Sequence, residues 1–213
     1  MINLKIAIQK SGRLNEDSLT LLKECGISIN NGKDQLMAQA SNFRLDVLYL
    51  RNSDIPQYVR DGVADIAIIG DNTEKEKKTG IRHVLDLGFS RCRLSIAVPK
   101  NVDFQDISYL QGKKIATSYP NSLKDFLTEN DIEAEIHEIS GSVEIAPNIG
   151  LADAICDLVS SGSTLFKNGL KEVYKIFESQ AILVANSGLC GEKQELLAQL
   201  VFRIKAVLAA KLS

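Results

Sequence analysis

The sequence predicts an α/β protein, because apolar runs of strand length alternate along the chain with segments of helical periodicity. The composition is that of a globular chain, since 45% of the 213 residues are hydrophobic and 24% are charged. Four of the expected strands end on clusters of small polar residues, and open α/β sheets bind ligands at that edge. We therefore expect mostly parallel sheets with a polar ligand at the carboxyl ends of their strands.

The first elements are a strand and a helix. The Ile-rich run at residues 4–9 is typical of a buried strand. In the segment that follows, Leu21, Leu22 and Cys25 fall on one face of a helix. Gly26 stands where a helix-ending glycine belongs.

Three further strands and a short helix are expected before residue 73. Residues 36–40 and 44–50 are typical of strands, the second with alternating polarity. Asn52-Ser53-Asp54 supplies N-cap residues for a short helix with Pro56 in its first turn. Residues 64–72 form a mostly apolar strand, and the charged stretch after it indicates a solvated helix and loop.

The second half repeats the alternation and closes on a long helix. Strands are expected at residues 92–100, 113–120, 134–142 and 154–159. Between them we expect a helix from an Asn121-Ser122 cap and a short helix broken at Pro147. The closing amphipathic helix at residues 192–212 has an apolar face made of Leu196, Leu197, Leu200, Val201, Ile204, Val207 and Leu208.

Composition excludes several classes of protein. The net charge of −2 gives no electrostatic reason to expect nucleic acid or an acidic membrane as a partner. No apolar run approaches the roughly 18 residues of a membrane span, and the N-terminal stretch lacks a signal-peptide core. The four cysteines are widely spaced, and neither histidine stands in a catalytic pattern. We expect a cytoplasmic protein without a disulfide framework, a zinc site or a histidine-activated nucleophile.

The strand-end clusters favour an anionic ligand over turn chemistry alone, because small polar residues leave backbone N–H groups accessible and add hydroxyl donors. The longest cluster, at residues 160–164, contains hydroxyls on both sides of Gly162, whose backbone lets an oxygen approach closely. We expect a helix to start there and add its dipole. The four clusters are Gly70-Asp71-Asn72, Thr117-Ser118-Tyr119, Ser140-Gly141-Ser142 and Ser160-Ser161-Gly162-Ser163-Thr164.

Two carboxylates precede the longest cluster. Asp153 and Asp157 are four residues apart on the expected strand and point to the same side. Carboxylates that accept from ribose hydroxyls, beside a loop that takes a phosphate, suit a ribose 5-phosphate. The motif is not a Walker A loop, and from these residues alone a capped helix behind a half-exposed strand is an equally good interpretation.

Cations also follow expected strands. Lys10 and Arg13 flank a Ser-Gly turn after the first strand and could neutralise a di- or triphosphate. Arg51, Arg91 and Arg93 stand at other strand ends, and each is also compatible with an ordinary surface charge.

Seven segments, in collinear order over most of residues 4–186, closely resemble the ATP phosphoribosyltransferase family, which carries out the first step of histidine biosynthesis. The last segment is similar to that family's highly specific signature. The segments are IAIQKSGRL, LRNSDIP, DGVADIAIIGDN, DLGFSRCRLSIAVP, KKIATSYP, ISGSVEIAP and LADAICDLVSSGSTL.

The resemblance implies a two-lobed fold like the type II periplasmic binding proteins, with the active site in the interlobe cleft. Lobe I would comprise residues 1–98 and 178–213, and lobe II residues 99–177. The family's reaction is displacement of pyrophosphate from phosphoribosyl pyrophosphate by N1 of the ATP adenine. Mg²⁺ would be carried by the substrate, with no metal ligand from the protein.

The resemblance also implies roles for individual residues. Lys10 and Arg13 would be the catalytic cations, facing the pyrophosphate or the ATP phosphates. Residues that would bind phosphoribosyl pyrophosphate are Glu144, Asp153, Asp157, Ser160, Ser161, Gly162, Ser163 and Thr164. Residues that would lie near the nucleotide are Arg51, Asp71, Ser90 and Tyr119.

Two features differ within the family. Some relatives have an arginine where this chain has Lys33-Asp34-Gln35. The contact that this arginine makes in those relatives is therefore not carried over to this chain. The wording of the motifs is similar to the long form of the enzyme, but the chain stops about where that form's regulatory domain would begin. We expect a long-form-like core without that domain, or a short form with a regulatory subunit, and in either case a homo-oligomer of two or more chains.

Two alternatives remain open from the sequence. One is a non-catalytic anion-binding module with the same two-lobed fold. The other is a phosphoribosyltransferase of the other major fold, which would not need the segments DGVADIAIIGDN and QKSGRL.

Overall fold

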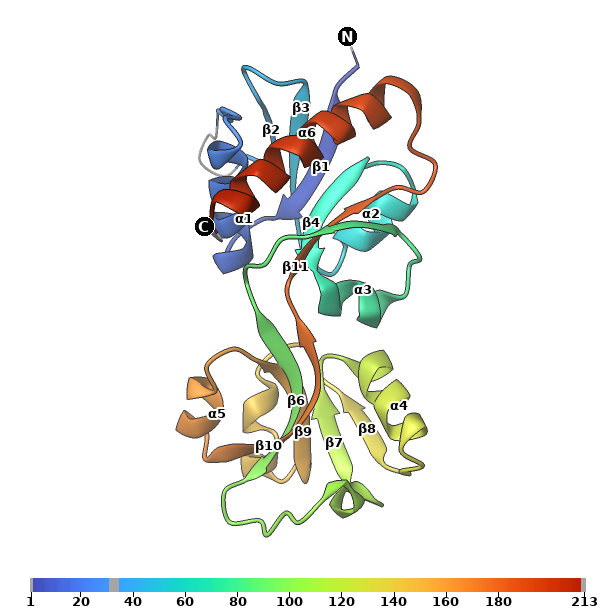
Figure 1. Cartoon of the computed structure of the whole chain (residues 1–213). Coiled ribbons are helices and arrows are strands. Elements are labelled where there is room, and N and C mark those ends of the chain that lie inside the picture. Colours follow the sequence, from blue (N-terminus) through green and yellow to red (C-terminus); the bar gives the residue numbers. More distant parts are fainter. Residues whose placement is uncertain (1, 31–34, 212–213) are drawn as a thin grey trace. The chain divides into compact units, whose positions relative to one another are not determined.

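The computed structural model describes residues 2–30 and 35–211 and divides the chain into two compact units, each with its own sheet (Figure 1). Unit 1 comprises Met1–Ser90 and Gln180–Ser213, and unit 2 comprises Arg91–Ser179. Lys33 and Asp34, two of the three residues at which the chain departs from some relatives, lie outside the described residues.

Unit 1 is built on a sheet with the strand order β2-β3-β1-β4-β11-β5. Its central strands β3, β1 and β4 run parallel, so their carboxyl ends meet at one edge. The strands are β1 (Leu4–Gln9), β2 (Met37–Gln39), β3 (Leu45–Leu50), β4 (Ile66–Gly70), β5 (Arg82–Asp86) and β11 (Ala181–Ala185). The helices are α1 (Arg13–Glu24), α2 (Ile55–Arg60), α3 (Asp71–Lys77) and α6 (Gly191–Ala210).

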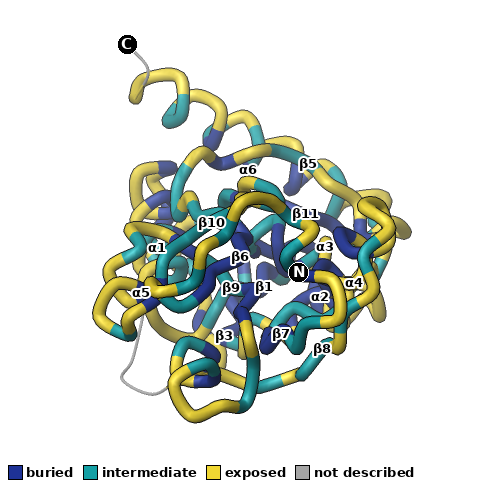
Figure 2. Tube along the Cα trace, turned by 90° about the horizontal axis from the view of Figure 1, so that it is seen from below, coloured by how far each residue is buried: buried dark blue, intermediate teal, exposed yellow. Residues whose placement is uncertain are grey.

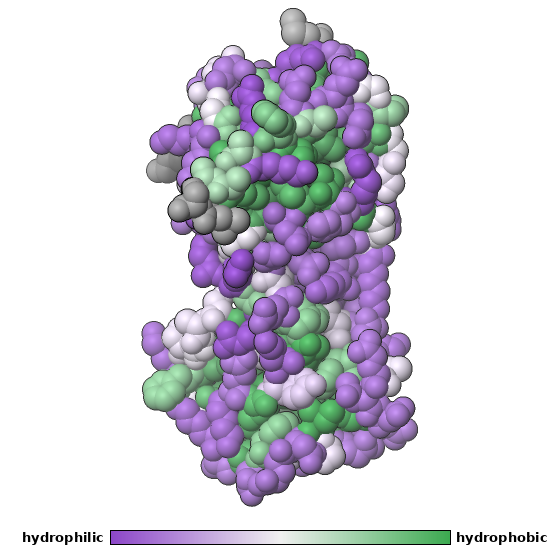
Figure 3. All heavy atoms as spheres, in the orientation of Figure 1, coloured by the Kyte–Doolittle hydropathy of each residue, from purple (hydrophilic) through white to green (hydrophobic). Residues whose placement is uncertain are grey.

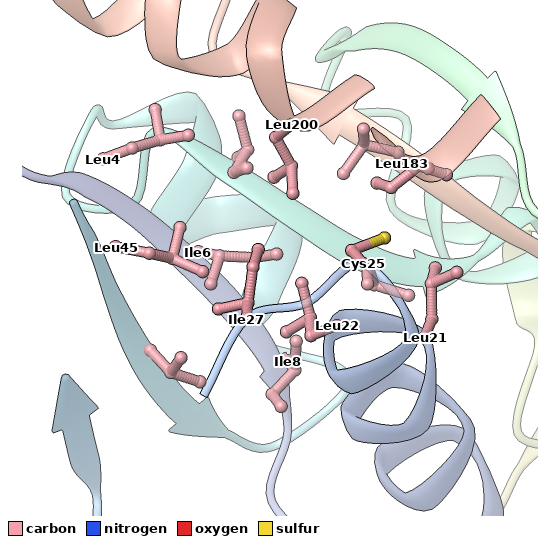
Figure 4. Close-up of a cluster of buried hydrophobic side chains, with 14 of the residues drawn as sticks. Leu4, Ile6, Ile8, Leu21, Leu22, Cys25, Ile27, Leu45, Leu183 and Leu200 are labelled. Carbon is pink, nitrogen blue, oxygen red and sulfur yellow. The ribbon is translucent and has the colours of Figure 1, made fainter. Parts of the chain in front are cut away.

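Helices cover both faces of this sheet. Successive strand residues point to opposite faces, so Ile6 and Ile8 pack with α1 and α6, whereas Ala7 packs with α2. Figure 4 shows the first of these layers, in which Leu22 of α1 and Leu200 of α6 converge on β1. Leu196, Leu197, Leu200 and Ile204 are buried, which confirms the predicted apolar face of the closing helix.

Unit 2 has a sheet with the strand order β10-β6-β9-β7-β8. Figure 2 shows β6 and β9 coloured as buried along much of their length. The strands are β6 (Cys92–Pro99), β7 (Lys114–Thr117), β8 (Glu135–Glu138), β9 (Ala154–Val159) and β10 (Leu170–Ser179). Two α-helices, α4 (Pro120–Glu129) and α5 (Ser163–Lys167), accompany the 3₁₀ turns η1 (Ile107–Leu110), η2 (Val143–Ile145) and η3 (Pro147–Ile149).

The two faces of the unit 2 sheet differ in what covers them. On one face, Leu123 and Phe126 of α4 pack on Leu94 and Ile96 of β6. The opposite face, which carries Ile155 and Val159, is covered by η2, by Leu165 of α5 and by the start of β10. Alternation along β9 places the side chain of Asp157 on this second face as well.

The sheets are mixed, which corrects the expectation of mostly parallel pairing. Among the described strand pairs, four are parallel and five antiparallel. The parallel pairs are central, whereas the strands β5 and β10, which form two of the antiparallel pairs with β11 and β6, have no clear strand pattern in the sequence and were not predicted. In β10 the pairing is interrupted by two register shifts, so its polar and apolar residues do not alternate cleanly.

The predicted lobe boundaries at residues 98/99 and 177/178 are also corrected. Strand β6 pairs with β9 and β10, so it belongs to the sheet of unit 2 and the boundary lies at Ser90. On the return of the chain the boundary lies at Gln180.

Three helices differ from prediction in ways that bear on the site. Helix α4 begins at Pro120 with Tyr119 as N-cap, not at the Asn121-Ser122 pair, because proline is well suited to the first helical turn. Helix α3 buries Glu76 and so is not wholly solvated. Helix α5 has only five residues, so it contributes less dipole to an anion than expected.

The surface is mainly hydrophilic on the face seen in Figure 3, with apolar side chains showing between polar ones. Within residues 2–30 and 35–211, no helix has both the length and the apolarity that crossing a membrane requires.

Candidate active site

Three of the predicted polar clusters meet at one edge of the unit 2 sheet. Strands β9, β7 and β8 are parallel neighbours, so the residues after Val159, Thr117 and Glu138 follow strand ends on the same edge. The expectation that these clusters would share an edge is therefore confirmed for unit 2.

The hydroxyl-rich loop, residues 160–164, turns sharply after β9 and includes the first two residues of α5. Gly162 has a φ of 76°, a backbone conformation that strongly favours glycine. Ser161 Oγ donates to Ser163 Oγ at 3.1 Å and accepts from the Ser163 amide at 3.4 Å. Four of the five residues are exposed, so the loop lies at the surface of unit 2.

A cavity of about 140 Å³ opens beside the hydroxyl-rich loop. Its lining combines loop backbone and hydroxyls with two carboxylates, Glu144 of η2 and Asp157 of β9. Burial raises the pKa of Asp157 to about 6, and the negative charge of Glu144 adds to the rise, while the Leu158 amide, which donates to Asp157 at 2.8 Å, opposes it. The lining of the cavity thus combines N–H and hydroxyl donors with carboxylate acceptors.

Asp153 lies at the opposite end of the strand. It immediately precedes β9, and its carboxylate accepts from the Lys114 amide at 2.9 Å, at the start of β7. Asp153 was expected to lie with Asp157 beside one ribose, but Asp153 does not line the cavity. The carboxylate that lines the cavity together with Asp157 is Glu144. Four residues of strand span roughly 13 Å, so two residues on one face still stand far apart.

The strand next to β9 supports the same edge by hydrogen bonds. Thr117 Oγ1 donates to the Cys156 carbonyl at 2.7 Å and accepts from the Tyr119 amide at 2.8 Å. Ser118 Oγ donates to the Ile139 carbonyl at 2.6 Å. Tyr119 packs its side chain against the apolar core on the α4 face, so the structure gives this predicted nucleotide contact a packing role.

The corresponding edge of unit 1 carries the predicted cations. Lys10 follows β1, Arg51 follows β3 and Asp71 follows β4, and these three strands are parallel neighbours. The Lys10 amide donates to the Leu50 carbonyl at 2.7 Å, which extends the pairing of β1 and β3 beyond the strands. Lys10, Arg13 and Arg51 are exposed.

Asp71 and Ser90 have partners within unit 1. Asp71 pairs with Lys75 at 2.5 Å in the first turns of α3, and Ser90 donates to Asp17 at 2.7 Å. A Cβ at Gly70, the residue before Asp71, would lie 2.3 Å from Asn72 Oδ1, so a larger residue there would require the Asn72 side chain to shift. The unit 1 edge therefore combines exposed cations with a tightly packed turn.

Two residues near the unit 2 cavity were not predicted from the sequence. Ser95 and Glu172 are hydrogen-bonded at 2.8 Å behind the hydroxyl-rich loop. No local sequence signal connects the two residues, because Glu172 lies 77 residues from Ser95 along the chain. Only the three-dimensional pairing of β6 with β10 links them.

The two units, each an α/β sheet packed with helices, define the chain as a protein with the periplasmic-binding-protein fold. The ATP phosphoribosyltransferase family model matches residues 51–206. The chain therefore belongs to the ATP phosphoribosyltransferase family, the enzymes of the first step of histidine biosynthesis.

Curated relatives agree with this assignment. ATP phosphoribosyltransferase of Cytophaga hutchinsonii is 59% identical over 204 residues, which cover 96% of this chain and 71% of the relative. The enzyme of Phocaeicola vulgatus is 53% identical over 98% of this chain and 74% of its own length.

Solved structures support both the family and the fold. A chain of the ATP phosphoribosyl transferase (HisG:HisZ) complex from Thermotoga maritima superposes with a TM-score of 0.83 at 29% identity, covering 97% of this chain and 99% of that one. A substrate-binding protein of an amino acid ABC transporter reaches a TM-score of 0.63 at 13% identity, over 98% of this chain and 94% of its own, which shows a shared fold. The phosphoribosyltransferase of the other major fold is thereby excluded.

Proposed function

We propose that unit 2 binds the phosphoribosyl part of phosphoribosyl pyrophosphate and that the cations of unit 1 act on its pyrophosphate or on the ATP phosphates. The observation that carries the proposal is the cavity whose lining combines the hydroxyl-rich loop with the carboxylates of Asp157 and Glu144. Loop amides and hydroxyls suit the 5-phosphate, and the carboxylates suit the ribose hydroxyls as acceptors.

The proposed reaction needs little proton transfer. Adenine N1 attacks C1 of the ribose as a neutral nucleophile, the C1–O bond to pyrophosphate breaks, and pyrophosphate leaves with that electron pair. Catalysis then depends on orienting the two substrates and on stabilising the leaving-group charge. In this scheme Asp157 and Glu144 orient the ribose, while Lys10 and Arg13 offset the charge of the departing pyrophosphate.

We further propose Mg²⁺ as the cofactor, carried on the pyrophosphate. Bound in that way, it would neutralise charge on the leaving group. Across the described part of the chain, no group of three or more His, Cys, Asp or Glu residues could hold a metal ion.

Assembly is part of the proposal. The solved Thermotoga maritima relative is a complex of two named chains, HisG and HisZ. By that similarity, we propose that this chain works as a homo-oligomer of two or more copies and associates with a regulatory subunit.

The function is tested by an absorbance assay for phosphoribosyl-ATP with ATP, phosphoribosyl pyrophosphate and Mg²⁺. We expect turnover, and we expect Lys10→Met and Arg13→Met each to lower kcat by roughly 10² to 10³, as for removal of one charge-stabilising group. Lys23→Met, at the far end of α1, is the matched control and should leave kcat unchanged. Absence of both turnover and substrate binding in the unaltered protein would refute the proposal.

Thr164 is expected to contribute directly to phosphate affinity, because it lines the cavity. Thr164→Ala should weaken ribose 5-phosphate binding by about 1.5–3 kcal/mol, the usual value of a hydrogen bond to a charged group. Isothermal titration measures this, and Thr164→Ser, which retains the hydroxyl, should recover most of the affinity. Thr128→Ala on α4, whose hydroxyl bonds only locally to the Lys124 carbonyl, is the control. Equal affinity in the unaltered protein and all three variants would contradict the proposal that the hydroxyl-rich loop binds the phosphate.

A further inference from the structure

A charged pair holds the first residue of the hydroxyl-rich loop from behind. Arg93 of β6 donates two hydrogen bonds to Glu172 of β10, from Nε to Oε1 and from Nη2 to Oε2, both at 2.5 Å. The remaining guanidinium nitrogen, Nη1, donates to the Ser160 carbonyl at 3.1 Å. One guanidinium thus joins β10 to the residue at which β9 ends and the loop begins.

Glu172 is itself fixed. Ser95, which is 1% exposed, donates to Glu172 Oε1 at 2.8 Å. Strand β10 changes register between Glu172 and Tyr174, and such bulges re-aim side chains. The hydrogen bond from Arg93 lowers the pKa of Glu172 and raises that of Arg93, so both stay ionised near neutral pH.

The same strands carry the cavity carboxylate. In the pairing of β6 with β9, Arg93 lies opposite Val159 and Ser95 lies opposite Asp157. Arg93, Ser95 and Asp157 therefore occupy one face of the sheet, the face on which η2 and α5 pack. The Arg93–Glu172 pair lies directly alongside the part of β9 that leads into the loop.

The hydrogen bond to the Ser160 carbonyl orients more than that oxygen. The peptide unit is planar and trans, so the amide of Ser161 points in the direction opposite to the Ser160 carbonyl. While Arg93 holds the carbonyl toward β6, the Ser161 amide is turned away from β6. Ser160, Ser161 and Gly162 all line the cavity. The orientation of this peptide plane therefore determines the direction in which one donor of the cavity, the Ser161 amide, points.

We propose that Arg93, locked by Glu172, is a positioning residue that fixes the peptide plane at the start of the phosphate-binding loop. The inference rests on the proposed function of that loop. This positioning role requires an arginine, because its planar guanidinium donates to both oxygens of the Glu172 carboxylate and still has an N–H group for the Ser160 carbonyl. A lysine would keep the charge but could not make all three bonds in this geometry.

The test compares four variants with the unaltered protein: Arg93→Lys, Arg93→Met, Glu172→Gln and, as control, Lys114→Met. Lys114 forms an exposed ion pair with Glu135 between β7 and β8, at the opposite edge of the same sheet. Ribose 5-phosphate affinity is measured by isothermal titration, the KM for ATP by the product assay, and folding by the melting temperature.

We expect both Arg93 variants to weaken ribose 5-phosphate binding by roughly 10-fold or more, the effect of losing a hydrogen bond made by a charged group. Glu172→Gln should show a smaller loss, since the amide can retain one of the two bonds from Arg93. The KM for ATP should stay close to that of the control.

Each other result counts against a particular statement. If the unaltered protein does not bind ribose 5-phosphate, the proposed function fails and this inference fails with it. If it binds but Arg93→Met binds equally well, only the positioning role is refuted. Full affinity in Arg93→Lys with loss in Arg93→Met would assign Arg93 a charge effect instead. A parallel loss of affinity, ATP KM and melting temperature would assign it a general structural role.

Discussion

Asp157→Asn is expected to stabilise the protein at pH 8 while weakening its affinity for phosphoribosyl pyrophosphate. The pKa of Asp157 is raised from 3.8 to about 6, chiefly by burial. Between those two values the folded state holds a proton that the unfolded state has released, so the free energy of unfolding falls as the pH rises. Above pH 6 the ionised carboxylate costs about 3 kcal/mol, the equivalent of the shift.

Asparagine removes that cost and keeps the shape of the side chain. We expect Asp157→Asn to gain about 1–3 kcal/mol at pH 8 and nothing near pH 4, with a rise in melting temperature of roughly 2–12 °C. Phosphoribosyl pyrophosphate affinity should fall by about 10-fold or more, because hydrogen bonds to a charged acceptor are lost. In the unaltered protein this affinity should also decline as the pH drops through about 6.

The control is Glu135→Gln, which alters an exposed carboxylate in the same sheet and should change stability by less than about 0.5 kcal/mol. Melting curves from pH 4 to pH 8 and titrations at the same pH values give both quantities. A destabilised Asp157→Asn protein at pH 8, or one with undiminished affinity, would show that Asp157 is not a strained ligand-binding carboxylate.

Local sequence signals predicted the parts of the site that depend on neighbouring residues. One short segment of sequence contains the end of β9, Gly162 and the hydroxyl residues around it. The structure places this segment at the carboxyl ends of the parallel strands, as expected. Lys10 and Arg51 were likewise found because each follows an apolar strand. The parallel central pairings then bring such strand ends together without further information.

The failures share a different cause. Asp153 was paired with Asp157 because alternation fixes the face of a strand, but alternation does not fix the end at which a residue stands. Arg93 and Glu172 lie 79 residues apart and meet only because β10 pairs with β6. Strand β10 is rich in polar residues, and its pairing with β6 is interrupted by two register shifts. Its conformation is therefore determined by its pairing partner more than by its own residues.

A second large effect is expected at Asp65, which ties α6 to the sheet of unit 1. Asp65 is 4% exposed; its carboxylate accepts from the Lys5 amide at 2.8 Å and pairs with Lys193 of α6 at 2.8 Å. Breaking a buried pair by removing one partner typically costs about 3–5 kcal/mol. Lys193 is one-third exposed, so we expect about 2–4 kcal/mol for Asp65→Ala, because solvent relieves part of the unpaired charge.

For a chain of this length that loss corresponds to a fall in melting temperature of roughly 4–16 °C. Asp65→Asn retains an acceptor for the Lys5 amide and should lose less. Asp86→Ala, which removes an exposed pair with His83 in the same sheet, should change stability by less than about 0.5 kcal/mol.

Hydrogen exchange distinguishes a local from a global effect of Asp65→Ala. Lys193 stands in the first turns of α6, whose Leu196, Leu197 and Leu200 cover β1. If the pair fixes that end of the helix, α6 amides should exchange faster in Asp65→Ala, whereas those of β7 and β9 in the other unit should not. Because Asp65 immediately precedes β4, at the edge opposite to the one that carries Lys10, the KM for both substrates should be unchanged well below the melting temperature. Unaltered exchange in α6 would mean that the apolar face alone holds the helix and that the buried pair contributes nothing to its docking.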